Sequence, residues 1–169
     1  MAGLLRLVGD TERAAAAVRS GCEIGGRLMA KDRTVRRWKE ELRLQCLEER
    51  VRLALASKAP EEAVSIAREE VRVASLSNGP TATMAAVWRA TAHNLLGNSL
   101  AARGSRDQAA ASWRAAAAQW PKNVTLSPEY LAVGADIQRD AGDVAAAQAI
   151  SARLTTMGYR HPEFVRSRA

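Results

Sequence analysis

Apolar and charged residues follow one another in short runs along the chain, and glycine and proline interrupt these runs at intervals that suit helical hairpins. Alanine, leucine, arginine and glutamate dominate, while strand-favouring residues are scarce. The pattern therefore predicts an all-α chain of consecutive antiparallel helices with short loops. We expect helices over about residues 11–31, 32–57, 60–76, 81–103, 105–119, 128–141 and 143–157.

Residues that favour helix starts mark several of these boundaries. Asp32 is a good N-cap, so we expect it to begin the second helix. Pro60, followed by two glutamates, suits the first turn of the third helix, where acidic residues meet the positive end of the helix dipole. Asp143 is expected to cap the last helix.

The segment from 90 to 123 carries small and large residues at the spacing of a known repeat. The positions concerned are Leu96, Gly97, Leu100, Gly104, Ala109, Trp113, Ala116 and Pro121. They resemble the tetratricopeptide repeat, a helical hairpin of about 34 residues. The resemblance implies that Gly97 and Ala109 are small where two helices approach closely. It also implies that Trp113 and Leu100 fill the groove between neighbouring repeats.

A second, more degenerate copy follows. Its matching positions are Tyr130, Val133, Gly134 and Ile137 on a first helix, and Ala146 and Ile150 on a second. Arg153 and Gly158 depart from the repeat pattern, as expected of a terminal, capping repeat. The first half, with Trp38 and Trp88 50 residues apart, is similar to the tetratricopeptide-like arrays of large bacterial multidomain proteins.

The resemblance implies a right-handed superhelical solenoid of about three and a half hairpins, or seven to eight helices. We expect one domain over residues 1–169, with a partial repeat at 1–31, repeats at 32–77, 81–121 and 127–160, and a tail at 161–169. The first apolar residues of the chain resemble the end of a helix, which favours the C-terminal portion of a larger protein. A native start at Met1, with a short first helix as a cap, is the alternative interpretation.

Charge and cysteine content narrow the class of protein only slightly. The chain has 25 Lys and Arg against 18 Asp and Glu, a net charge of +7, and the excess is spread over both halves. No apolar run approaches the ~18 residues that span a membrane. Two cysteines are too few for a disulfide framework, so we expect a cytoplasmic protein.

We expect no catalytic, metal-binding or cofactor-binding residues. The two histidines have no ligand partner at helical spacing. Cys22 lies within an apolar helix face, which favours a small core residue over a nucleophile. Asp136 and Asp140 cluster near Asp143 without forming a recognisable site.

The repeat itself points to binding. By the resemblance, Asn94 and Asn98 occupy the first helix of their repeat and face the concave groove, where amides can satisfy a bound peptide backbone. Ala132 stands where the next repeat would place its asparagine, so the family's carboxylate clamp is incomplete. Two solvated amides are an equally open interpretation. The candidate partner-binding residues are Glu41, Glu48, Thr91, Asn94 and Asn98.

Three functional hypotheses follow from these patterns. The first is a scaffold that binds a protein or peptide partner. The second is nucleic-acid binding through a segment at 23–38 that resembles a helix-turn-helix, with Arg33, Arg36 and Arg37 as contacts. Met29 at the turn position argues against this helix-turn-helix motif. A simple solvated basic helix is the alternative interpretation of the same residues. The third is self-association or autoinhibition of an upstream effector domain.

Overall fold

The computed structural model describes residues 2–32, 36–122, 124–162 and 164. Within these ranges the chain is helical and contains no strand, which confirms the predicted all-α class. The helices are α1 (Ala2–Leu7), α2 (Thr11–Lys31), α3 (Arg36–Ala56), α4 (Pro60–Leu76), α5 (Ala82–Ala102), α6 (Arg106–Gln119), α7 (Pro128–Asp140) and α8 (Val144–Thr156). Helices α2 to α8 correspond to the seven predicted ones, except that α3 begins at Arg36 and not near residue 32.

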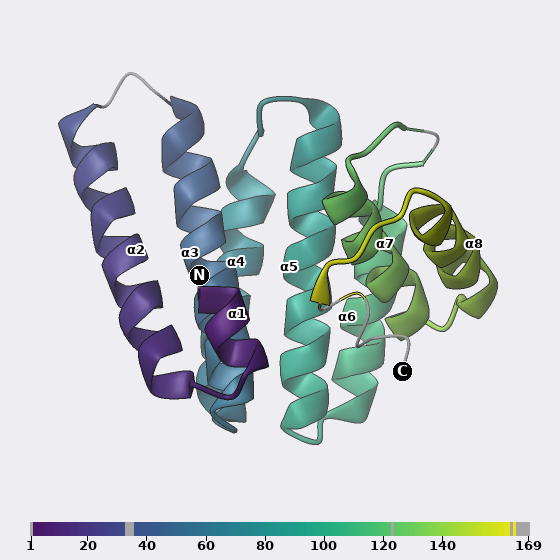
Figure 1. The fold of residues 1–169 in the computed structure, drawn as a ribbon, viewed down its shortest axis with the longest axis horizontal. Helices are drawn as coiled ribbons and strands as arrows, with labels where there is room; N and C mark the ends of the chain where they lie inside the picture. Colours follow the sequence, from purple (N-terminus) through teal and green to yellow (C-terminus); the bar gives the residue numbers. More distant parts are fainter. Residues whose placement is uncertain (1, 33–35, 123, 163, 165–169) are drawn as a thin grey trace.

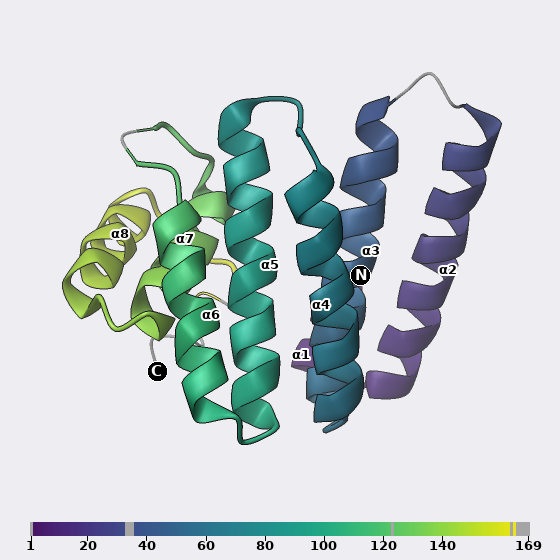
Figure 2. The same ribbon diagram turned by 180° about the vertical axis from the view of Figure 1, so that it is seen from behind.

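The helices form two faces. Each helix packs against its neighbour in sequence, and α3 and α7 also contact α5, while α1 contacts α3. Figure 1 shows this odd-numbered face, with α1 in front of α3. Figure 2 shows the opposite side, where α4 and α6 lie nearest the viewer.

The same turn joins each odd-numbered helix to the next even-numbered one. Its central residue has a positive φ: 81° at Gly9, 56° at Lys58, 88° at Gly104 and 92° at Gly142. In each turn this residue donates its N–H to the carbonyl three residues earlier, and the next N–H bonds the carbonyl five residues earlier. This is the Schellman arrangement, which satisfies the last carbonyls of a helix. The hairpins thus repeat at the level of backbone hydrogen bonds.

A buried alanine follows each of these turns after five residues. Ala14, Ala63 and Ala109 are 0% exposed and Ala147 is 4% exposed. The sequence pattern matched Ala146 to this position, which is wrong by one residue. In the last hairpin, Gly134 and Gly142 are separated by one residue more than Gly97 and Gly104 are in the hairpin before it. The register of α8 therefore shifts by one residue.

Two glycine–tryptophan contacts set how closely α5, α6 and α7 approach. A Cβ on Gly97 would overlap the indole of Trp113, which confirms the predicted close approach of α5 and α6. A Cβ on Gly134 would lie 2.5 Å from Cζ2 of Trp120. Trp120 therefore fills the space between the α5–α6 hairpin and α7, a role that the resemblance had suggested for Trp113.

Buried apolar side chains form two main clusters, with α5 contributing to both. One joins α3, α4 and α5 through residues such as Leu47, Ile66 and Leu95. The other lies among α5, α6, α7 and α8 and includes Ile137 and Leu154. The core therefore lies between the packed helices.

Two predictions about α2 are wrong. Asp32 does not begin α3: it ends α2, and its N–H donates to the carbonyl of Leu28. Cys22 is not a separate small core residue: it is half-buried and forms a disulfide with Cys46 of α3, with a Cα–Cα distance of 5.4 Å. Their spacing of 24 residues gave no sign that the two helices would bring them opposite each other.

Candidate binding groove

Two adjacent pockets lie on the odd-numbered face. The first, of about 410 Å³, is lined by side chains from α1, α3, α5 and α7. The second, of about 630 Å³, is lined by α1, α3, α7 and the segment after α8. Four residues line both pockets: Arg6, Arg52, Val133 and Asp136. We call the two pockets together the odd-helix groove.

The lining of this groove is acidic, although the chain as a whole is basic. It contains three arginines, Arg6, Arg52 and Arg139, and five carboxylates, Glu48, Glu49, Glu129, Asp136 and Asp140. With His161 neutral, its formal charge is therefore −2, against +7 for the chain. Such a field favours a cationic ligand over an anionic one.

Ion pairs within α3, and one between α1 and α3, hold these side chains. Arg52 lies 2.7 Å from Oε1 of Glu48 and 3.7 Å from Oε1 of Glu49, all on α3. The Nη2 of Arg6 lies 3.3 Å from Oε2 of Glu49 and so ties α1 to α3. The arginines therefore neutralise only part of the acidic lining.

The amides of Asn94 and Asn98 are built into a network. Asn98 accepts a hydrogen bond from Nε1 of Trp113 through its Oδ1, at 2.8 Å. Both side chains line the first pocket together with the carboxylate of Asp140. Burial raises the pKa of Asp140 and nearby Asp136 raises it further, while the amides of Asn94 and Asn98 and the guanidinium of Arg139 lower it. Two simply solvated amides are therefore not what the structure shows.

Asn94 keeps one acceptor unused. Its side chain lines the first pocket, the residue is only 7% exposed, and its Oδ1 accepts no hydrogen bond. Leaving a buried acceptor unpaired costs about 1–3 kcal/mol. A ligand group that donated to this oxygen would recover that free energy.

Glu70, on α4, is a buried acid. It is 2% exposed, and its Oε2 has no hydrogen-bond partner. Burial raises the pKa of this carboxyl well above its ordinary value, nearby Glu48 raises it further, and Arg52 lowers it. Glu70 therefore favours its neutral form in the folded chain.

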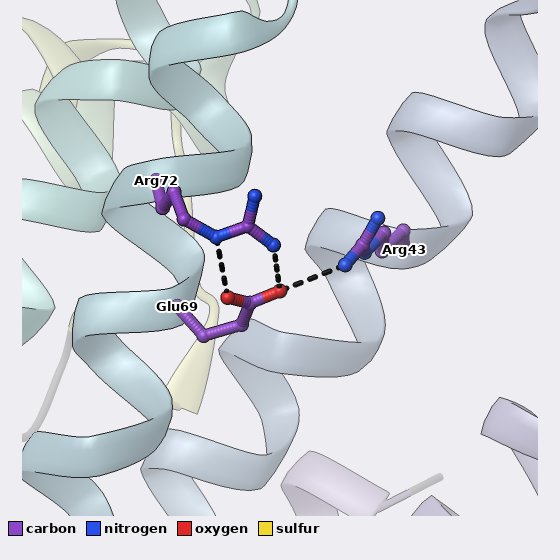
Figure 3. Close-up of polar contacts among 3 residues, drawn as sticks. All are labelled: Arg43, Glu69 and Arg72. Atoms are coloured by element: carbon purple, nitrogen blue, oxygen red, sulfur yellow. Dashed lines mark hydrogen bonds and ion pairs between the residues drawn. The ribbon is translucent and has the colours of Figure 1, made fainter.

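The outer surface of α3 and α4 carries a different kind of ion pair. Glu69 accepts from Arg72 on its own helix at 2.7 and 2.8 Å, and from Arg43 of α3 at 2.7 Å (Figure 3). Its pKa is lowered, mainly by the hydrogen bond from Arg72. All three side chains are solvent-exposed, and exposed pairs of this kind contribute little to stability.

The sequence-predicted binding residues divide between the pockets. Thr91, Asn94 and Asn98 line the first pocket together, and Glu48 lines the second. Glu41 lines neither of them.

The proposed nucleic-acid contacts cannot be placed. Arg33 lies outside the described residues, and so do the side chains of Arg36 and Arg37, which begin α3.

Sequence reasoning missed the residues that join the two pockets. Asp136 and Asp140 were noticed as a cluster, and their spacing of four places both on one face of α7. That spacing was the sequence signal that the two aspartates act together. No such signal marked Arg6 and Arg52, because their position depends on how α1 folds back onto α3.

Two further observations concern membrane-spanning helices and similarity to known proteins. In the described part of the chain, no helix has both the length and the apolar character to cross a membrane. No protein-family model, curated protein or solved structure matches the chain. Its function therefore has to be argued from the geometry of the groove.

Proposed function

We propose that this chain is a tetratricopeptide-like solenoid whose hairpins stack so that the odd-numbered helices line a concave surface. The recurring Schellman turn and the alanine that follows it support this arrangement. So does Gly97, packed against Trp113 as the repeat pattern requires. On this proposal the repeat boundaries follow the hairpins α3–α4, α5–α6 and α7–α8.

The corresponding activity is non-enzymatic: the chain binds a helix or extended segment of a partner protein in the odd-helix groove. One observation carries the proposal. Two pockets of about 410 and 630 Å³ adjoin on the face where α3, α5 and α7 present charged and amide side chains. Polar groups that converge on a concave site give a ligand its orientation and specificity.

The test is capture of partners from host lysate treated with nuclease, with a variant that blocks the groove. Thr91→Arg places a long side chain in the first pocket. Ala111→Arg, on an exposed site of α6, adds the same charge elsewhere and is the matched control. Circular dichroism of both variants checks that the helices are intact.

We expect a stoichiometric protein partner with the wild type and with Ala111→Arg, and its loss with Thr91→Arg. A partner retained by Thr91→Arg would show that binding occurs elsewhere. Recovery of nucleic-acid-associated proteins alone, abolished by nuclease, would favour the basic segment at 23–38 instead.

A further inference from the structure

The N-terminal helix α1 forms part of the wall of the odd-helix groove. Gly3, Arg6 and Leu7 lie three and four residues apart, so they share one face of α1. All three line the second pocket, opposite residues of α3 and α7. In Figure 1, α1 accordingly lies in front of α3 on the odd-numbered face.

Arg6 is the anchor of this contact. Its side chain is only 10% exposed, and its guanidinium reaches Glu49 of α3 at 3.3 Å. It lines both pockets, so it stands between them.

Helix α1 is short and contacts both α2 and α3. It has six residues, and isolated helices shorter than about 12 residues are marginal in water. It has no acidic residue in its first turn, and Val8 just beyond it is 78% exposed. We therefore expect its helical form to depend on these contacts.

We propose that α1 is an internal occupant of the odd-helix groove, and that the groove's partner is a protein segment carrying an arginine or lysine on an apolar helix face, which displaces α1. This inference rests on the proposed function. The chemistry follows from the acidic lining, because complementary charge selects partners and speeds their association. Arg6 shows how such a cation is held, by the carboxylate of Glu49.

The probe is a synthetic peptide with the sequence of residues 2–9, capped at both ends, titrated into ¹⁵N-labelled full-length protein. A second peptide carries glutamate in place of its arginine. Resonances of Val133 and of the Asn94 and Asn98 side-chain amides report occupation of the groove. The proteins are wild type, Arg6→Ala, Arg6→Lys and Arg114→Ala, in which an exposed arginine of α6 is removed as the control.

We expect the arginine peptide to bind Arg6→Ala at least about tenfold more tightly than wild type, since a tethered segment has a high effective concentration. Arg6→Lys should stay close to wild type, because it keeps the charge, and Arg114→Ala should match wild type. The glutamate peptide should bind Arg6→Ala at least about tenfold more weakly than the arginine peptide.

Equal affinity for wild type and Arg6→Ala would overturn the inference, and so would equal affinity of the two peptides. In either case shifts at Val133 would still support a peptide-binding groove. Absence of any shift in all four proteins would also overturn it, because α1 would then not be a groove ligand. The capture experiment with Thr91→Arg tests the proposed function independently of that result.

Discussion

Replacing Gly97 by alanine tests the packing on which the helix arrangement depends. The added Cβ would lie 2.5 Å from Nε1 of Trp113 and closer still to Cδ1 of the same ring. The indole has to move, and its hydrogen bond of 2.8 Å to Asn98 is lost or lengthened. Because Asn98 lines the first pocket, the disturbance reaches the odd-helix groove.

The magnitude follows from three opposing contributions. Overpacking a tight contact costs about 1–3 kcal/mol. Losing the indole hydrogen bond costs about 1 kcal/mol. About 1 kcal/mol of this loss is offset, because alanine is a better helix former than glycine. The net loss is about 1–3 kcal/mol, and a loss of about 2 kcal/mol lowers Tm by about 4–8 °C in a chain of this size.

Thermal unfolding followed by circular dichroism measures this change, and Gly21→Ala is its matched control. Gly21 is also in a helix, but nothing lies within 4 Å of an added Cβ, so the same substitution should raise stability by up to about 1 kcal/mol. Opposite signs at the two glycines are the expected result. A Gly97→Ala protein as stable as the wild type would refute the close approach of α5 and α6.

Three further predictions concern α2 to α4. Burial raises the pKa of Glu70 above the 4.5 of the unfolded chain, so stability should fall as pH rises from about 4.5, and Glu70→Gln should remove that slope in Tm–pH profiles. Replacing Cys22 and Cys46 by serine should lower the free energy of unfolding by up to about 3.5 kcal/mol, as the loop-entropy relation gives for this disulfide. A reductant should lower the Tm of the wild type alone, and an unchanged wild-type Tm would contradict the disulfide. Lys58→Gly should raise the unfolding free energy by about 1 kcal/mol in urea titrations, because lysine has a φ of 56° there, whereas Lys58→Ala should give no such gain.

Local signals explain why most of the fold could be predicted. Gly104 and Pro60 lie where the backbone geometry requires them, at a left-handed turn and in a first helical turn, and neither depends on distant contacts. Lys58 shows the limit of this reasoning. It adopts the same left-handed turn without being glycine, so only comparison of the hydrogen bonds reveals that the turn recurs.

The candidate site was less accessible to prediction, because its residues meet through tertiary contacts. Thr91, Asn94 and Asn98 share one face of a single helix, and their grouping could be predicted from spacing. Asp140 joins them only because α7 packs on α5. Arg6 enters from a short helix whose position no periodicity determines.

Burial is unequal along the chain, and this bears on how the groove could open. Helix α5 has nine buried residues of 21, whereas α2, of the same length, has three. Regions with little buried apolar surface open locally at low free energy. Asn94 and Asn98 of the groove lie on α5, which has the larger number of buried residues. The disulfide ties α2 to α3, so α2 is covalently retained if α1 leaves. Release of α1 should therefore require only its own contacts, with Arg6 on Glu49 foremost, and leave the floor formed by α5 and α7 in place.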